Sequence, residues 1–262
     1  MAPQGDELLA AVELSPRAAS AHDRAGWVGL FTADGRVEDP VGARPHVGRT
    51  QIGRFYDTFI GPREIVFHRD LDVVRDHVVV RDLELGVVMG WVTMAIPAYL
   101  RYDLREVDGE WKIAVLRAYW ELPAMMLQFL RNGARAAPAA VQLSYALLRN
   151  QRLLGTAGFT AGFRHAGSRH KGLLAKFLST LAHADLPAAQ RMTSGATITV
   201  GDRQLVDIAE FAERFRGASW TKMIAAGSTI AVSISTEQGR GVMFTEPARR
   251  AGRITRIRYF PA

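Results

Sequence analysis

The sequence contains no cysteine among its 262 residues. This absence excludes a disulfide-bonded scaffold, a thiolate nucleophile and a cysteine-ligated metal centre, and it agrees with a reducing compartment. No basic segment followed by an apolar run stands at the start, so we expect no signal peptide. The longest apolar-rich stretch, residues 136–148, is shorter than the roughly 20 residues that a bilayer span needs. We therefore expect a cytoplasmic protein, with peripheral membrane contact left open.

Acidic residues are absent from residues 122–184, which carry eight arginines and lysines. The whole chain has a net charge of +7, so the remainder is close to neutral. Apolar helical stretches interleaved with arginines suit an anionic membrane surface, and helices packed between modules with solvated arginines would give the same pattern. Both alternatives stay open. The segment has few aromatics and no recognition motif, so we expect no nucleic-acid partner.

Motifs for cofactor chemistry are also missing. The seven histidines show no metal-ligand spacing, and the chain has no phosphate loop, dinucleotide fingerprint or nucleophile elbow. We therefore expect no metal and no cofactor.

Apolar periodicity predicts helices first and strands afterwards in the N-terminal half. Two short helices separated near Pro16 are expected in residues 7–31, and another in residues 51–59. A short strand is expected between these helices, at residues 36–42. After Gly61-Pro62, period-two alternation predicts strands at residues 65–67, 73–80, 87–94, 99–107 and 111–120. Asp108-Gly109 is a hairpin signal. This order is typical of an α+β fold.

The same order recurs after residue 171. Helices are predicted at residues 173–182, 185–192 and 205–215, and strands at residues 196–200, 222–225, 229–235, 241–245 and 253–259. An internal duplication is the simplest account. We expect two modules, residues 1–121 and residues 169–262, joined by a basic helical insert at residues 122–168.

The segment from Val37 to Gly42, followed in register by Gly48, Ile52, Phe55 and Tyr56, resembles the active-site segment of the ketosteroid isomerases. This family belongs to the nuclear-transport-factor-2-like, or SnoaL-like, superfamily of cone-shaped α+β domains. The resemblance implies that each module is a curved antiparallel sheet wrapped around its N-terminal helices. It also implies that Asp39 is the base that shuttles a proton.

The resemblance continues through Tyr102-Asp103 and Arg117-Ala118-Tyr119-Trp120. Asp103 falls where the family has a carboxylic acid that stays protonated and donates to the substrate oxygen, and that family is itself the standard example of such a neutral acid. Proton transfer at carbon needs one carboxyl of each protonation state. We therefore expect Asp103 to be the oxyanion donor.

Two residues depart from the family pattern. Ser15 stands where the family has a tyrosine that donates to the oxyanion. Arg105 lies two residues beyond Asp103, on the same face of a regular strand, and a nearby cation favours the ionised carboxylate. Arg105 is therefore a candidate to contact a substrate or product oxygen itself.

Five apolar residues are expected to line or support a hydrophobic pocket: Phe31, Tyr56, Trp91, Met94 and Trp120. A regular strand points Trp91 and Met94 to opposite faces, so only one of them can face the pocket. Tyr56 could also replace the missing tyrosine as a donor. In the second copy Val200 stands at the position of Asp39, so we expect that module to lack this chemistry.

These residues suggest a steroid delta-isomerase-like enzyme that shifts a double bond in a 3-ketosteroid or similar hydrophobic enone. Two alternatives stay open: a non-catalytic steroid- or lipid-binding protein, and a SnoaL-like cyclase or epoxide hydrolase. The expected partner is a small hydrophobic ligand. The family often dimerises through its sheet, so a homodimer or an intrachain pseudo-dimer is expected.

Overall fold

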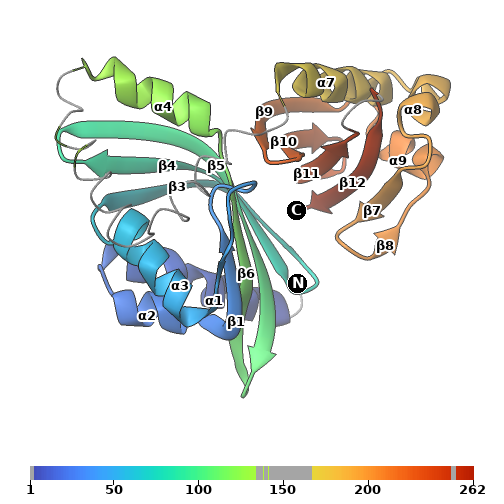
Figure 1. Cartoon of the computed structure of the whole chain (residues 1–262). Helices are drawn as coiled ribbons and strands as arrows, with labels where there is room; N and C mark the ends of the chain where they lie inside the picture. Colours follow the sequence, from blue (N-terminus) through green and yellow to red (C-terminus); the bar gives the residue numbers. More distant parts are fainter. Residues whose placement is uncertain (1–2, 134–137, 139–140, 142–166, 249–251) are drawn as a thin grey trace. The chain divides into compact units, whose positions relative to one another are not determined.

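A computed structural model describes residues 3–133, 138, 141, 167–248 and 252–262 (Figure 1). The chain divides into two compact units, Met1–Arg164 and His165–Ala262. Among the described residues, no helix combines the length and apolar character needed to cross a bilayer. Most of the basic insert predicted at residues 122–168 lies outside the described residues, so its contact with an anionic membrane stays a prediction.

Unit 1 has helices before strands, as the periodicity predicts. Helix α1 continues through Pro16 and is not broken there, which corrects the sequence prediction. The elements are α1 (Pro3–Ser20), α2 (Arg24–Gly29), β1 (Phe31–Glu38), β2 (His46–Val47), α3 (Gly48–Phe55), the π-helical turn η1 (Tyr56–Ile60), β3 (Glu64–Arg75), β4 (Val78–Met89), β5 (Val92–Val107), β6 (Glu110–Tyr119) and α4 (Leu122–Arg131).

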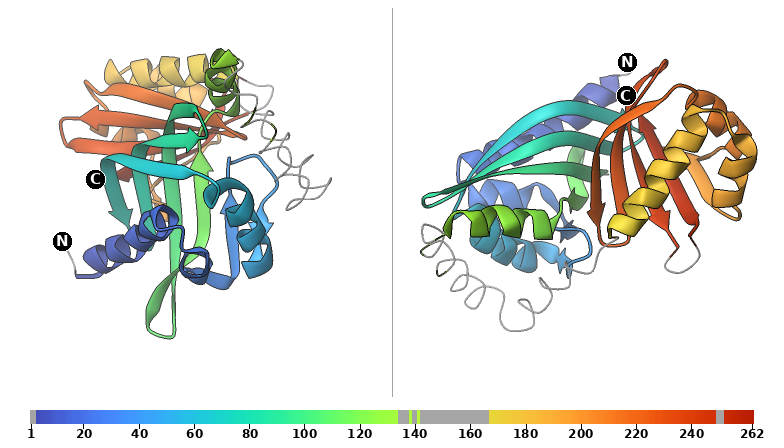
Figure 2. Two further views of the ribbon diagram at one scale, coloured as in Figure 1. Left: turned by 90° about the vertical axis from the view of Figure 1, so that its left-hand side faces the viewer. Right: turned by 90° about the horizontal axis from the view of Figure 1, so that it is seen from above.

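The strands of unit 1 form one curved six-stranded sheet in the order β2-β1-β6-β5-β4-β3 (Figure 2). Strand β1 pairs parallel with β6, and every other pair of neighbouring strands is antiparallel. The sheet is therefore mixed, which corrects the expectation of a wholly antiparallel sheet. Parallel neighbours need a long connection between them, and here residues 39–109 lie between β1 and β6. It brings the ends of these two strands to the same edge.

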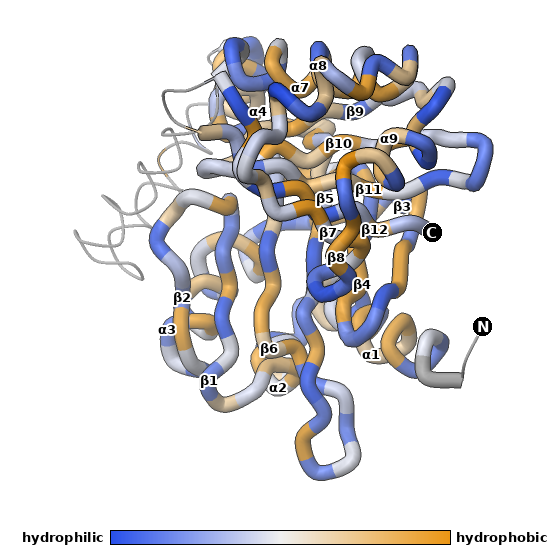
Figure 3. Tube along the Cα trace, turned by 90° about the vertical axis from the view of Figure 1, so that its right-hand side faces the viewer, coloured by the Kyte–Doolittle hydropathy of each residue, from blue (hydrophilic) through white to orange (hydrophobic). Residues whose placement is uncertain are grey.

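Buried apolar residues alternate along the strands and form one inner face of the sheet. Helices α1, α2 and α3 cover this face (Figure 2), and Figure 3 gives the hydropathy of each residue along the trace. On β5 the even-numbered positions from Val92 to Leu104 are buried in the inner clusters. Left-handed residues make the tight turns between strands, namely Asp76, Gly90, Asp108 and Gly109. The Asp108-Gly109 hairpin is confirmed, whereas the predicted strands 73–80 and 87–94 each run through a turn.

Unit 2 repeats this order and this topology. Its sheet order is β8-β7-β12-β11-β10-β9, with β7 parallel to β12. The elements are α7 (Ser168–Ala182), α8 (Leu186–Met192), β7 (Thr197–Val200), β8 (Gln204–Leu205), α9 (Ile208–Arg214), β9 (Ser219–Ala226), β10 (Thr229–Thr236), β11 (Gly239–Pro247) and β12 (Ile254–Pro261).

A shared helix cap strengthens the correspondence between the units. Asp23 precedes α2 and accepts a hydrogen bond from Gly26 N, and Asp185 precedes α8 and accepts one from Ala188 N. Both carboxylates satisfy a backbone donor that has no partner within its helix. The α+β class and the two-module arrangement are confirmed.

Candidate functional site

An apolar cavity of about 120 Å³ lies on the inner face of the unit 1 sheet. We call it the Asp39 cavity. Helix α3, turn η1, the strands β3, β4 and β5, and helix α4 all contribute to its wall. Its lining residues are apolar apart from a carboxylate, a guanidinium and an indole N–H: Asp39, Phe55, Phe59, Ile60, Arg63, Ile65, Leu85, Val87, Met89, Met94, Ile96, Trp120 and Met125.

Asp39 stands directly after β1, where the backbone is fixed against β6. Val41 N donates to Ala118 O at 2.8 Å, and the Asp39–Pro40 peptide bond is cis. Trp120 follows β6 and donates its indole Nε1–H to Asp39 Oδ1 at 2.6 Å. The two residues meet because β1 and β6 run parallel and end at the same edge of the sheet.

The environment of Asp39 raises the pKa of its carboxyl from 3.8 to about 6. Burial among apolar side chains is the main cause, since it disfavours the charged form. The Trp120 hydrogen bond and the positive charge of Arg63 act in the opposite direction and hold the pKa below that of an unassisted buried acid. A carboxyl with this pKa is mostly ionised at neutral pH and is still basic enough to accept a proton.

Arg63 is the second charged group in the cavity wall, and sequence reasoning missed it. Its side chain is buried, with the residue 8% exposed. Nη1 donates to Thr58 O at 2.6 Å, and the guanidinium lies 5.7 Å from the ring centroid of Phe59. Burial lowers the pKa of Arg63 to about 10, and nearby Asp39 counters that shift, so the guanidinium stays charged at neutral pH.

Two of the expected pocket residues, Trp120 and Met94, line the cavity. Met94 faces the cavity, and Trp91 lies in the turn between β4 and β5 with 84% of its surface exposed. Phe31 and Tyr56 lie in the core beneath the helices, where both rings contact Trp27. Neither of these core residues lines the cavity.

Asp103 and Arg105 also lie outside the cavity wall. Tyr102 and Leu104 on either side of Asp103 belong to the inner core, so the Asp103 side chain points to the opposite face of the sheet. Its carboxylate accepts from Arg101 Nε at 2.7 Å and also pairs with Arg117. Arg105 is half exposed and pairs with Asp34. The oxyanion role expected for Asp103 therefore finds no support in this geometry.

Ser15, at the position of the family tyrosine, is part of the core. It is 4% exposed, and its Oγ accepts the indole N–H of Trp27 at 3.1 Å. Its position explains how the chain accommodates serine where a phenol was expected: the hydroxyl satisfies a buried donor.

A Ser15→Tyr substitution should therefore destabilise unit 1 and should not create an oxyanion donor. Adding a phenol ring to a packed core costs about 1–3 kcal/mol, and Trp27 loses its acceptor. Thermal unfolding should show a lower midpoint than wild type, with no gain in any proton-transfer activity. A variant with unchanged stability and faster turnover would contradict the assigned position of Ser15.

Helix α4 closes the end of the Asp39 cavity. Met125 lines the cavity, and Phe129 packs with Val92 and Met94 of β5. β6 pairs with β5 only from Tyr99 onwards, so the earlier part of β5 has an open edge on that side. Gln128 covers this edge, because its amide accepts from Ala95 N at 3.2 Å and donates to Ala95 O at 2.8 Å.

Replacing Gln128 with alanine should loosen α4 from the edge of β5. Loss of two hydrogen bonds at an exposed site, each worth about 1 kcal/mol or less, should speed amide exchange at Ala95 by roughly 3- to 10-fold. Hydrogen-exchange measurements on the peptide containing Ala95 test this. Gln190→Ala, an exposed change on α8, is the control and should leave that peptide unchanged.

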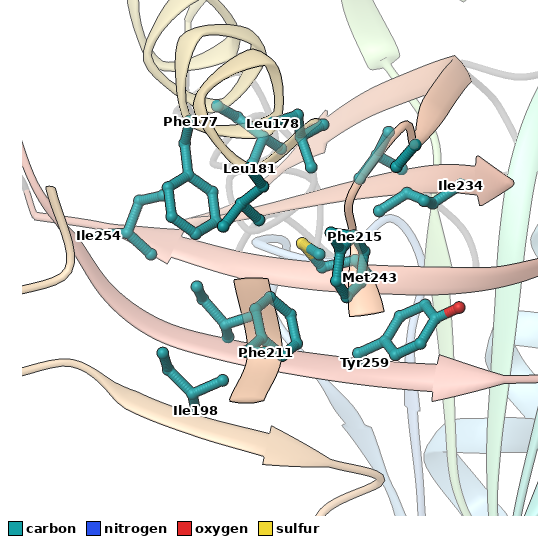
Figure 4. Packing of buried hydrophobic residues seen from close by; sticks show 14 of the residues in the cluster. Phe177, Leu178, Leu181, Ile198, Phe211, Phe215, Ile234, Met243, Ile254 and Tyr259 are labelled. Atoms are coloured by element: carbon teal, nitrogen blue, oxygen red, sulfur yellow. The ribbon is translucent and has the colours of Figure 1, made fainter. Parts of the chain in front are cut away.

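In the described part of unit 2, the position that corresponds to Asp39 carries valine in place of a carboxylate. In both units a core pair marks the register of the parallel strands, Val37 with Leu116 and Ile198 with Ile257. Asp39 lies two residues beyond Val37, and Val200 lies two beyond Ile198. Val200 is 2% exposed and belongs to the core cluster drawn in part in Figure 4.

No set of three or more histidine, aspartate or glutamate side chains gathers into a metal site in the described part of the chain. Among the described residues, the cavity wall offers a single carboxylate, that of Asp39.

Residues 7–126 match the model of the nuclear transport factor 2 (NTF2) domain. Unit 1 therefore contains an NTF2-like domain, and the two sheets of the chain fit a tandem of such modules. None of the curated proteins matches the chain.

Several solved structures are similar to part of the chain. The Rv0760c protein of Mycobacterium tuberculosis has 26% sequence identity, with 47% of this chain and 96% of that chain covered and a TM-score of 0.42. The Δ5-3-ketosteroid isomerase from Mycobacterium sp. has 26% identity, with 45% and 96% covered and a TM-score of 0.41. An epoxide hydrolase of the LEH-like type from M. tuberculosis has 18% identity, with 49% and 93% covered and a TM-score of 0.43.

Proposed function

We propose that the protein is a cofactor-independent isomerase that shifts a double bond in a 3-ketosteroid or similar hydrophobic enone. The observation that carries this proposal is Asp39, a single carboxylate with a pKa of about 6 in an apolar cavity. Proton abstraction beside a carbonyl needs a base that is ionised at neutral pH and is screened from water. The resemblance of Val37–Gly42 to the ketosteroid isomerase segment supports the same role.

In this mechanism Asp39 Oδ takes a proton from the carbon next to the substrate carbonyl. The C–H electron pair forms a new C=C bond, and the carbonyl π electrons move onto oxygen to give a dienolate. The protonated Asp39 then returns the proton to a different carbon, and the carbonyl reforms. Trp120 keeps one Asp39 oxygen in place throughout, because its indole N–H donates to either protonation state.

The lining also suits a large hydrophobic ligand. Met89, Met94 and Met125 contribute flexible thioether side chains to the wall. Methionine adapts its shape with little cost, so these side chains can rearrange around a ring system larger than the present cavity.

The test is the conversion of 5-androstene-3,17-dione to its conjugated enone, followed by ultraviolet absorbance. Wild type should turn over, and Asp39→Asn should lower kcat by roughly 10²- to 10⁴-fold, the usual contribution of a general base. In wild type, kcat/KM should rise with pH through about 6 and then level off, because the ionised form of Asp39 is active. Turnover unaffected by Asp39→Asn would remove Asp39 from the mechanism.

A second candidate function is steroid or lipid binding without catalysis. One observation favours it: in the described residues, the cavity wall contains no second carboxyl that could donate to the substrate oxygen. Steroid binding that quenches Trp120 fluorescence without enone formation would support this candidate. Trp120→Phe would identify the responsible indole.

A further inference from the structure

The guanidinium of Arg63 is positioned in the cavity wall with part of its hydrogen-bonding capacity unused. Nη1 is held by Thr58 O. Within the described part of the chain, Nε and Nη2 donate to no protein atom, yet neither is a fully buried unpartnered atom. These two nitrogens therefore keep accessible surface on a residue that lines the cavity and is 8% exposed.

A buried cation with unused donors is costly unless a ligand completes its shell, because burial removes water from the charge. Asp39 does not supply that partner directly. The two side chains influence each other's charge, but the hydrogen bonds given for the described residues join Arg63 to Thr58 and Asp39 to Trp120. Instead, one oxygen of Asp39 is bonded to Trp120. A ligand in the cavity therefore meets a carboxylate and a separate guanidinium.

The guanidinium is also held in a fixed orientation. Its bond to the backbone of η1 and its position over the Phe59 ring restrict a side chain that would otherwise lose much rotamer entropy on binding. The edge formed by Nε and Nη2 is a planar fork of donors, the geometry that best matches an anionic oxygen. Donors that are fixed before the reaction stabilise developing charge without reorganisation.

We propose that Arg63 is the electrophilic residue of the Asp39 cavity, which binds the carbonyl oxygen of the substrate and stabilises the oxyanion that forms there. This inference rests on the proposed function. Asp39 removes the proton from carbon, and the negative charge that appears on the substrate oxygen is met by hydrogen bonds from Arg63, which keeps its own protons. Arg63 thereby takes the role that the family resemblance implies for Asp103 and for the tyrosine whose position Ser15 occupies.

This assignment also defines the ligand class. The cavity takes a molecule with an apolar body and one oxygen that is anionic or becomes anionic, and it places that oxygen at Arg63. A phenol of moderate acidity imitates the dienolate without reacting, so its ionisation in the bound state reports on the charges that line the cavity, Arg63 and Asp39.

The experiment measures binding of 2-naphthol, whose neutral and ionised forms have distinct absorbance and fluorescence. Spectra across pH give the pKa of the bound naphthol for wild type, Arg63→Lys, Arg63→Met and Asp39→Asn. Wild type should bind the naphtholate and lower its pKa. Arg63→Met should raise that bound pKa by at least one unit and weaken binding of the anion 10-fold or more, and Arg63→Lys should lie between the two.

Asp39→Asn should bind the naphtholate more tightly than wild type, because the asparagine side chain removes a negative charge from the cavity. Arg49→Met, which removes an exposed arginine on α3 outside the cavity wall, is the matched control and should behave as wild type. Circular dichroism of each variant establishes that it is folded. If Arg63→Met misfolds, the Arg63→Lys variant tests the assignment in its place. If naphthol bound to Arg63→Lys has the same pKa and the same affinity as naphthol bound to wild type, the assignment is overturned.

The two proposals fail in different ways. Naphthol binding requires no turnover, so loss of the Arg63 effect would overturn the electrophile while leaving Asp39 as a base. Enone formation that survives Asp39→Asn would overturn the base while the naphthol titration still reports on Arg63.

Discussion

Replacing Asp39 with asparagine should stabilise the fold at neutral pH, although it removes the proposed base. The pKa of Asp39 is about 6 in the folded protein, whereas 3.8 is its ordinary value. Between these pH values the folded state binds more protons than the unfolded state, so stability falls as pH rises from 4 to above 6. The difference between a pKa of 3.8 and one of about 6 corresponds to about 3 kcal/mol of stability that wild type loses when Asp39 ionises. Asparagine carries no charge, so the variant keeps this stability.

Urea unfolding of wild type and Asp39→Asn at pH 4, 6 and 8 tests whether the substitution stabilises the fold. The increase in the free energy of unfolding of the variant over wild type should be small at pH 4 and largest at pH 8. Asp34→Asn is the control, because Thr32 and Arg105 lower the pKa of the exposed Asp34 carboxyl and its charge favours folding. A gain for Asp39→Asn that is equal at all three pH values would show that charge burial is not its cause.

The expected gain connects stability with function. A buried carboxylate is unfavourable for the fold, and here a single indole N–H and a guanidinium offset only part of that cost. Sites that hold perturbed groups of this kind are commonly functional, because a structural core would use an apolar side chain instead. Unit 2 makes this comparison within the same chain, since its corresponding position is valine.

The sequence was sufficient to predict the features of the fold and the site that follow from local pattern. Helix and strand order, the Asp108-Gly109 hairpin and the repeat in the second half all come from periodicity and turn residues. Alternation also showed that Trp91 and Met94 could not both face the cavity. Alternation could not decide which of the two faces the cavity. The predicted strand 87–94 includes the turn at Gly90, and alternation of faces does not continue through a turn.

The position of Asp103 had a local signal that the family resemblance outweighed. Leu100, Tyr102 and Leu104 alternate with Arg101 and Asp103 along β5, which indicates an apolar inner face and a charged outer face. That pattern alone places the carboxylate away from an apolar cavity. The resemblance carried no information about which partner groups surround Asp103 in this protein.

No local sequence pattern indicated that Arg63 and helix α4 would contribute to the cavity wall. Arg63 follows Gly61-Pro62 in a connection without periodicity, and its entry into the cavity depends on how η1 leads into β3. Helix α4 was assigned to the insert from its apolar face and basic surroundings. Its packing on β5 depends on where β6 ends, a long-range feature that pairing between strands determines.

Introducing aspartate at Val200 should destabilise unit 2 by about 4 kcal/mol or more, because an isolated carboxylate in a packed apolar core must either take up a proton or open the structure. Val200 lies in the same cluster as Phe211, Phe215 and Tyr259 (Figure 4). The ring centroid of Phe215 lies 4.4 Å from that of Phe211 and 4.8 Å from that of Tyr259. Thermal unfolding and hydrogen exchange of peptides from β7 measure the loss.

The matched control is Val200→Ala, which should cost about 2 kcal/mol for two lost carbons and a small cavity, with no dependence on pH. The penalty of Val200→Asp should grow from pH 4 to pH 8, because burial raises the pKa of a carboxyl and the ionised form is the unfavourable one. A pH-independent penalty equal to that of alanine would mean that water or a cation reaches this position. A carboxylate is tolerated at Asp39 because it lies beside a cavity, accepts a hydrogen bond from Trp120 and is near the charge of Arg63, whereas Val200 lies in a packed apolar cluster.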